Sequence, residues 1–374
     1  MTTIFYVYPE LVIALNKKVI FVNPNDLQIF KEIVLPDDLT KCGLKENAGD
    51  DPEQDEDKSK QNKAKEQPII QHVKMSPSRQ LLAITTSGQK AVLLYTLRPE
   101  HAKLVSVRSL ARASSALAFS KDSKSLLVSD KTGDCYEYSC DDYEAAPKLL
   151  LGHLSIVYDI LWSMDEKFII TCDRDDKIRV TNYPNTVDIH TYCLGHKEFV
   201  AGVELLNENV LISVSGDKTL KLWDFKEGKE LQTIELPAPG IKMSIKNCSD
   251  GKYEVSVLLH QPNECVIQYE ISQNEEGQWI CSSGDVLSFT DVICCGLTYA
   301  EDRLYVVGVI NDHLTLRLSP KSPAAPANWM TMIEEQFKEY SWTPEDISSW
   351  FKKKFDNVSE YLERKKRRIE EKQK

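Results

Sequence analysis

The sequence predicts an all-β fold, a seven-bladed β-propeller followed by a C-terminal helical extension. The pair Gly152-His153 recurs 43 positions later as Gly195-His196, and apolar runs separated by a charged turn follow each pair. A period of 40–45 residues that closes on Trp-Asp, as at Trp223-Asp224, is typical of one four-stranded blade. Once an acidic insert is set aside, roughly 290 of the first 320 residues remain, which is enough chain for seven blades.

The other blades are expected on either side of this repeated stretch. Residues 4–35 hold short apolar runs broken by Pro9, Asn16 and Asn23, which predicts the strands that open the ring. Residues 69–97 and 113–139 each alternate apolar strands with short polar turns and predict one blade each. Residues 240–272 and 288–318 give weaker copies without a Trp-Asp ending. We therefore expect the propeller to occupy residues 1–320.

An acidic segment interrupts the ring. Between Glu46 and Asp57 the chain has seven acidic residues and no basic one, and a lysine-rich run to Lys65 follows. With almost no apolar side chain to bury, such a segment cannot offset the entropy cost of ordering. We expect residues 41–66 to be a disordered insertion. A solvated loop and an acidic docking site or decoy for nucleic acid both remain open.

The character of the chain changes after the last expected strand. Residues 321–342 form a proline-rich connector. Thr343 and Pro344 are typical of a helix N-cap and first helical position. An apolar stripe at helical spacing follows, made of Ile347, Trp350, Phe351, Phe355, Val358, Tyr361 and Leu362. We expect a helical basic tail over residues 343–374, with its apolar face on the propeller or on a partner.

A basic cluster lies in this tail, and it comprises Arg364, Lys365, Lys366, Arg367 and Arg368. It fits nuclear import or contact with phosphates, and a merely solvated tail is the alternative. The whole chain carries a net charge of −11. Because phosphate contacts need clustered lysine and arginine, any RNA contact must be local or belong to a partner.

Composition and motifs exclude several classes. Pro9, Glu10 and Asn16 break the apolar runs of the N-terminus, so we expect neither a signal peptide nor a membrane span. The ten cysteines lack metal-ligand spacing and are expected to be reduced. The sequence has no glycine-rich nucleotide-binding loop, G-x-S-x-G elbow or H-E-x-x-H pair. We expect no catalytic residue, bound cofactor or metal in this chain.

The repeat resembles the WD40 family. That resemblance assigns His196, Ser213, Asp217 and Trp223 to a buried hydrogen-bonded tetrad. Each polar group then finds a partner inside the blade. The first copy offers His153, Thr171 and Asp175, but Thr181 stands where the tryptophan should be. We expect this tetrad to be incomplete, and we expect both histidines to be structural.

Three segments carry a narrower resemblance. They are LLLGHLSIVYDILWSMDEKFIITCDRDDKIRV, CLGHKEFV (193–200) and FKKKFDNVSEYLERKKRR (351–368). Together they are similar to the non-catalytic WD-repeat subunits of tRNA (guanine-N7) methyltransferase. The resemblance implies a scaffold without chemistry that forms a heterodimer with the catalytic subunit. That subunit would hold S-adenosylmethionine and methylate a guanine in the tRNA variable loop, and tRNA would be bound mainly through it. We expect a nuclear location, with a cytoplasmic pool as an alternative.

The resemblance also implies an interface with the catalytic subunit, made of Lys131, Asp173, Arg174, Asp175, Lys177 and Arg179. Five of these charged residues, of both signs, lie within the seven positions 173–179, which exceeds what a blade needs and suits a complementary surface. We expect Lys177 and Arg179 to contact the partner. Asp175 is ambiguous because it also occupies the tetrad position.

Two other functions remain open at this stage. One is a generic adaptor, such as a ubiquitin-ligase substrate receptor or a chromatin scaffold. Against the ligase reading, Lys226 follows Trp223-Asp224-Phe225 where the ligase-binding WD40 box usually has arginine. The other is an autonomous enzyme, which would methylate guanine without a partner.

Overall fold

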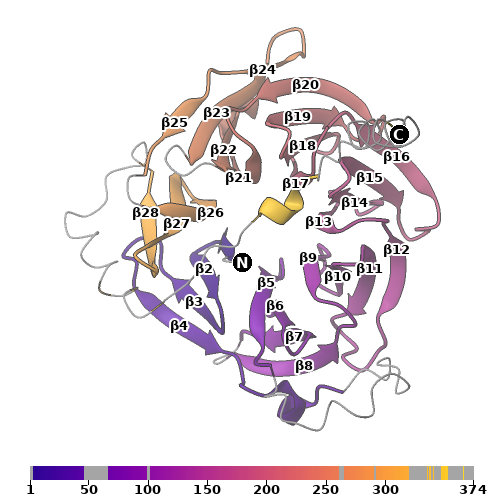
Figure 1. Cartoon of the computed structure of the whole chain (residues 1–374), viewed down its shortest axis with the longest axis vertical. Helices are drawn as coiled ribbons and strands as arrows, with labels where there is room; N and C mark the ends of the chain where they lie inside the picture. The colour runs from indigo at the N-terminus through magenta and orange to yellow at the C-terminus, as the bar shows by residue number, and fades with distance from the viewer. Residues whose placement is uncertain are drawn as a thin grey trace, which may run out of the picture.

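The structure is a ring of seven antiparallel sheets around a central channel (Figure 1). It is a computed structural model that describes residues 3–45, 66–98, 102–260, 265–289, 292–319, 335, 337, 340, 347–352 and 365. The predicted seven-bladed propeller is confirmed. Among the described residues, each of the first five blades has four strands in chain order from the channel outward, blade 6 has the same four and a fifth short strand, and blade 7 has three strands.

Blades 1 and 2 contain β1 (Thr3–Val7), β2 (Glu10–Leu15), β3 (Lys18–Val22), β4 (Ile29–Val34), β5 (Ile69–Met75), β6 (Leu81–Ser87), β7 (Ala91–Thr96) and β8 (Lys103–Ser109). Blades 3 and 4 contain β9 (Ser114–Phe119), β10 (Ser125–Asp130), β11 (Asp134–Ser139), β12 (Lys148–Gly152), β13 (Val157–Trp162), β14 (Phe168–Asp173), β15 (Lys177–Asn182) and β16 (Ile189–Leu194).

Blades 5 and 6 contain β17 (Val200–Leu205), β18 (Val210–Ser215), β19 (Thr219–Asp224), β20 (Lys229–Glu235), β21 (Gly240–Asn247), β22 (Tyr253–Leu259), β23 (Val266–Gln273) and β24 (Trp279–Cys281), with β25 (Asp285–Leu287) also paired to β23. Blade 7 contains β26 (Ile293–Ala300), β27 (Arg303–Ile310) and β28 (His313–Leu318). The short 3-10 helices are η1 (Leu39–Cys42), η2 (Ser249–Gly251) and η3 (Ser348–Trp350).

The strand sequences follow from the position of each strand in its blade. Every residue of β18 is buried, because neighbouring blades cover both faces of this middle strand. Such a strand reads as a continuous apolar run with small polar residues rather than as an alternation. The outermost strand of the same blade, β20, is mostly exposed and carries charged residues. The burial pattern thus orders the strands from the middle of the blade to its rim.

Apolar clusters join the blades. The seven boundaries of the ring each hold one such cluster within the described residues. Between blades 4 and 5, for example, Ile170 and Val180 of one sheet pack with Leu211 and Trp223 of the next. Removal of apolar surface from water is the main favourable contribution to this packing. A blade alone would leave both faces exposed, so its stability depends on its two neighbours.

Ring closure occurs between blades 1 and 7. Blade 1 is made entirely of β1–β4, so the two ends of the described propeller do not share a strand. Instead, Leu11 of β2 and Val307 of β27 lie in one apolar cluster with Phe337, which is fully buried. The amide of Leu314 donates to the carbonyl oxygen of Tyr340 at 2.9 Å, on the outer side of β28. Residues beyond the last strand therefore take part in closing the ring.

Two expectations about non-propeller segments need adjustment. The insertion was expected to start at residue 41, but η1 contains Lys41, and Leu39 within it is fully buried. Asp38 accepts from the amide of Thr40, and Gly43 closes η1 with φ +99°, a left-handed conformation that favours glycine. Residues 46–65, which hold the acidic run, lie outside the described residues.

In the tail, the connector prediction falls mostly outside the described residues. Among the described residues of the tail, η3 is a single 3-10 turn that gives way to extended backbone at Phe351. The predicted helix is therefore interrupted at that point, and Ile347, Trp350 and Phe351 pack in one apolar cluster around this turn. Apart from Lys365, which is helical, residues 353–374 lie outside the described residues.

The closure predicts that Phe337→Ala destabilises the whole propeller. Loss of a fully buried phenylalanine from the cluster should lower the free energy of unfolding by about 3–5 kcal/mol. Chemical denaturation measures this. Phe30→Ala on the outer strand β4 is the matched control, because that ring is 52% exposed and should cost less than about 1 kcal/mol. Equal losses for the two variants would show that Phe337 does not hold the ring closed.

Candidate partner-binding face

The second copy of the repeat has a complete chain of buried polar contacts. His196 Nδ1 lies 2.9 Å from Asp217 Oδ2, and His196 Nε2 lies 2.7 Å from Ser213 Oγ. Trp223 Nε1 donates to the same hydroxyl oxygen at 2.8 Å. These hydrogen bonds link the loop before β17 to the turn between β18 and β19. His196 has a structural role, because both of its ring nitrogens are engaged in these contacts.

The first copy uses a different aspartate from the one expected. His153 Nδ1 lies 3.0 Å from Asp173 Oδ2, and His153 Nε2 lies 2.8 Å from Thr171 Oγ1. The assignment of Asp175 to this position is wrong. Asp173 is the last residue of β14 and is buried, so its carboxylate reaches both the histidine and the turn amides of Asp175 and Lys177. In the second copy Ser215 stands at the position equivalent to Asp173 and has no carboxylate. Asp217 therefore makes the contact with the histidine in that blade.

Both carboxylates are held in the charged form. Burial alone would raise the pKa of Asp173, but hydrogen bonds from His153 and the Lys177 amide outweigh it and lower the pKa. The same balance applies to Asp217, where burial is outweighed mainly by the hydrogen bond and charge interaction with His196, and its pKa falls well below the usual range. Each carboxylate therefore stabilises the fold at neutral pH.

Arg179 belongs to the interior of blade 4. Its Nε donates to Thr181 Oγ1 at 3.0 Å and one terminal nitrogen donates to the carbonyl oxygen of Gly152 at 3.0 Å. Only 8% of the residue is exposed. Thr181 stands where the second copy has Trp223, so in this blade the arginine bonds the polar residue that replaces the tryptophan. Asp173 and Arg179 were both expected to contact a partner, but their side chains are used within the blade.

The remaining charged residues lie on one face of the ring. Arg174, Asp175, Asp176 and Lys177 form what we call the charged turn, between β14 and β15, and all are at least partly exposed. Lys131, in the turn between β10 and β11, is exposed at the same end of the neighbouring blade. The loop between β12 and β13 joins the two turns: the amide of His153 donates to Gly133 O, and the amide of Arg174 donates to Ile156 O. Lys131, Arg174, Asp175 and Lys177 therefore remain candidate partner contacts.

Leu154 adds an apolar residue that the sequence analysis did not single out. It lies in the loop between β12 and β13, and its side chain is fully exposed. The second copy has Lys197 at the corresponding place after Gly-His, so a leucine in a polar loop was the available signal. A lone exposed leucine flanked by charges of both signs resembles the centre of a protein interface, where apolar anchors are surrounded by polar residues.

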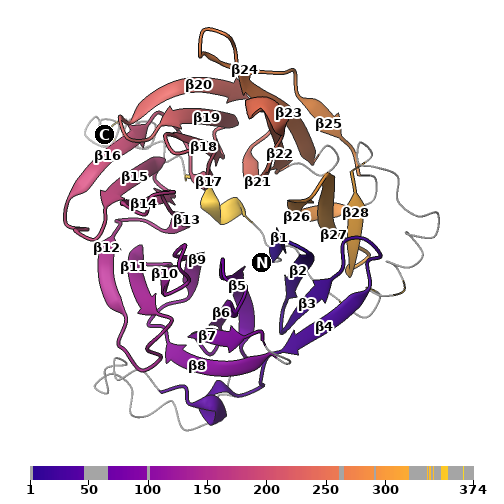
Figure 2. The same cartoon turned by 180° about the vertical axis from the view of Figure 1, so that it is seen from behind.

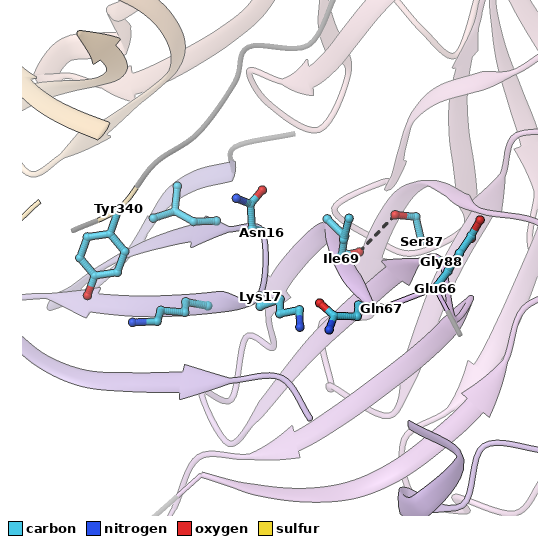
Figure 3. A pocket seen from close by; sticks show the side chains of 10 residues that line it. Asn16, Lys17, Glu66, Gln67, Ile69, Ser87, Gly88 and Tyr340 are labelled. Carbon is cyan, nitrogen blue, oxygen red and sulfur yellow. Dashed lines mark hydrogen bonds between the residues drawn. The ribbon is translucent and has the colours of Figure 1, made fainter. Parts of the chain in front are cut away.

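A cavity of about 830 Å³ lies elsewhere, between blades 1 and 2 (Figure 3). Lys17, Glu66, Gln67 and Tyr340 are among the residues that line it. Among its described lining residues the hydroxyl groups are those of Ser87 and Tyr340, and the carboxylate is that of Glu66.

The described part of the chain offers no group of three or more histidine, cysteine, aspartate or glutamate residues that could hold a metal ion. Within the same residues, no helix is long and apolar enough to cross a membrane. In the basic cluster of the tail, Lys365 is exposed, while Arg364, Lys366, Arg367 and Arg368 lie outside the described residues.

Comparison with known proteins gives consistent matches. The family model described as the tRNA methyltransferase TRM82 WD40 domain matches residues 39–142 and 138–275. A Drosophila mojavensis protein, "tRNA (guanine-N(7)-)-methyltransferase non-catalytic subunit wuho", is 54% identical over 100% of this chain and 99% of its own length. The Drosophila melanogaster protein of the same name is 45% identical over 100% of this chain and 98% of its own length.

Among solved structures, a chain of "Crystal Structure of Mitotic Checkpoint Complex" superposes with a TM-score of 0.65. It covers 86% of this chain and 87% of its own length, at 13% identity. At that identity the similarity shows the fold alone.

The site geometry predicts that Asp173→Asn lowers the free energy of unfolding by about 2 kcal/mol at pH 7, because hydrogen bonds to a buried carboxylate are lost or weakened. The pKa of Asp173 is lowered by folding, so its contribution is complete above about pH 4 and disappears as the pH falls through the folded-state pKa. Urea denaturation of both proteins between pH 7 and pH 3 should therefore give converging stabilities. Asp175→Asn is the control and should change stability by less than about 0.5 kcal/mol. Equal effects at the two positions would contradict the assignment.

Proposed function

The chain belongs to the family of non-catalytic WD-repeat subunits of tRNA (guanine-N7) methyltransferase, and on that premise we propose that it binds and stabilises a catalytic subunit that forms N7-methylguanosine in the tRNA variable loop. The observation that carries this proposal is the exposed charged turn, together with Lys131 and Leu154, on one face of blades 3 and 4. The polar groups around it are already satisfied inside the blades, so these side chains are the ones left to meet another protein.

The proposed interface combines charge with one apolar anchor. Lys131, Arg174 and Lys177 offer cations, and Asp175 offers an anion between them. A partner with the opposite arrangement would be steered to this face and held in one register. Leu154 would enter an apolar pocket on the partner and exclude water from the neighbouring ion pairs.

The proposed mechanism is scaffolding. A rigid ring that holds the catalytic subunit's RNA-facing elements in one arrangement removes conformational freedom that tRNA binding would otherwise have to overcome. S-adenosylmethionine would be held by the catalytic subunit, in a heterodimer with this chain. The tRNA would be bound mainly by that subunit, with phosphate contacts added by the cluster Arg364, Lys365, Lys366, Arg367 and Arg368. We place the complex in the nucleus, since the same cluster suits nuclear import.

Reconstitution tests the function directly. Transfer of methyl groups from S-adenosylmethionine to tRNA is measured for this chain alone, for the purified catalytic subunit alone and for an equimolar mixture. We expect no N7-methylguanosine from this chain alone and much more from the mixture than from the catalytic subunit alone. Activity of this chain alone would identify an enzyme instead. No gain in the mixture, together with ubiquitin-ligase or chromatin proteins in a pull-down, would favour a generic adaptor.

Charge reversal tests the face. The double substitution Arg174→Glu with Lys177→Glu should weaken binding of the catalytic subunit at least tenfold, because two attractive pairs become repulsive. Isothermal titration calorimetry measures the dissociation constant. Lys124→Glu is the control, since Lys124 is also a surface lysine but precedes β10 at the opposite end of the blades. Unchanged binding by the double variant, or equal weakening by the control, would remove this face from the interface.

A further inference from the structure

A short segment from the tail lies on the central channel. Residues 347–352 follow the propeller by almost thirty residues, yet η3 lies at the centre of the ring beside β17 in both views (Figures 1 and 2). Ile347 and Trp350 are 6% and 9% exposed. They form one apolar cluster with Phe199, which is fully buried. This placement gives the segment a defined seat on the propeller.

Aromatic contacts hold the segment in place. The ring of Trp350 stacks on Tyr158 of blade 4, with centroids 4.5 Å apart and planes at 23°. Its edge contacts Phe199, at the start of blade 5, at 5.5 Å and 87°. Phe351 packs against Phe199 at 5.0 Å and against His260, just after β22 of blade 6, at 5.9 Å. Stacked and edge-on geometries of this kind are the favourable ones for aromatic pairs.

The seat is built into blade 5. An added Cβ at Gly216 would lie 2.3–2.8 Å from three ring atoms of Phe199, so only glycine admits the ring at this position. Phe199 in turn lies directly before β17 and contacts both aromatic residues of the segment. The same turn carries Asp217 of the tetrad. The seat for the tail is therefore fixed by blade 5, the blade that holds the complete tetrad.

Below Trp350 the channel is lined by titratable side chains. A cavity of about 260 Å³ is lined by Trp350 and by His72, Lys74, Asp159, Glu204 and Lys242 among others. Burial raises the pKa of Glu204 to about 7 and lowers that of His72 to about 3. The indole therefore covers an interior that disfavours charge, at the mouth of the channel.

Polar contacts tie the end of the segment to the candidate partner-binding face. The amide of Lys352 donates to Glu198 Oε2 at 3.2 Å, and the ammonium group of Lys352 forms an ion pair with Asp176. Asp176 belongs to the charged turn. The chain therefore leaves its seat next to the residues that we assign to the partner.

We propose that residues 347–352 are an intramolecular latch that closes one mouth of the channel and fixes the origin of the basic tail beside the partner-binding face. The proposal rests on the proposed function, and it adds a mechanism by which the tail is delivered to RNA held by the catalytic subunit. The occupant of the channel mouth is this chain's own segment, since aromatic contacts and the two polar contacts of Lys352 hold it there in the free protein.

The latch shortens the tether of the basic cluster. Arg364 lies 12 residues after Lys352, so it stays within about 40 Å of that point. Without the latch the preceding described anchor is Tyr340, 24 residues before Arg364, and the limit rises to about 80 Å. Because the effective concentration of a tethered group falls roughly as the −3/2 power of tether length, halving the tether raises the effective concentration of the cluster at this face by roughly threefold.

The test uses the full chain with the catalytic subunit. In the variant Trp350→Ala with Phe351→Ala, we expect the KM for tRNA to rise roughly threefold, with kcat unchanged. A chain ending at Lys352 should show a comparable rise, and adding the two substitutions to it should have no further effect. Phe30→Ala, an exposed aromatic residue far from the channel, is the matched control and should leave KM unchanged.

A structural readout separates this proposal from the proposed function. Hydrogen exchange by mass spectrometry should show amides 347–352 protected in the free wild-type chain and unprotected in the double variant. Absence of protection in the wild type overturns the latch, whatever the activity. If protection is lost but KM is unchanged, or if the chain ending at Lys352 keeps the wild-type KM, the positioning role is overturned. A mixture with no methylation at all contradicts the proposed function, and the exchange result then still decides whether the latch exists.

Discussion

The structure depends on the packing of apolar side chains between neighbouring blades. A four-stranded sheet with apolar side chains on both faces has no stable arrangement in water unless both faces are covered. A closed ring meets this requirement for every blade at once, and each boundary holds one apolar cluster. The requirement also explains why the middle strands carry unbroken apolar runs while the rim strands are charged. Everything on the partner-binding face is displayed from the ends of these strands, so its geometry is inherited from the ring.

Polar groups enter this framework only where they are paired. In blade 5 a tryptophan, a serine, a histidine and an aspartate form one chain of contacts. In blade 4 the same histidine position pairs with Asp173, and Arg179 bonds the threonine that replaces the tryptophan. The buried polar contacts of the two blades use different residues but have the same effect. In both blades, the buried charged side chains of these contacts have hydrogen-bond partners. Arg174, Asp175 and Lys177 of the charged turn lie outside these buried contacts and are at least partly exposed, so they are available to another protein.

The sequence was sufficient for the architecture because its signals are local. The 43-residue period, the Gly-His pairs and the turn residues each reflect the short-range geometry of a single blade. The sequence was insufficient to decide whether Asp173 or Asp175 contacts the histidine. The two residues are only two positions apart, and the end of β14 determines which carboxylate faces inward. Arg179 looked like a surface charge because spacing does not reveal that Thr181 leaves it a polar partner inside. The seat of Trp350 depends on contacts between residues about 150 positions apart, and no local pattern encodes such pairing.

The absence of a shared strand between blades 1 and 7 has a genetic consequence. The strands of the described residues end at Leu318, yet Phe337 and Tyr340 lie beyond them and contribute to the junction between the two blades. A stop codon placed after the last of these strands but before residue 337 would thus keep their coding sequence and still remove Phe337 from the apolar cluster at that junction. Alleles that truncate the chain there would lower the stability of the ring, even though the reading frame of every described strand is intact.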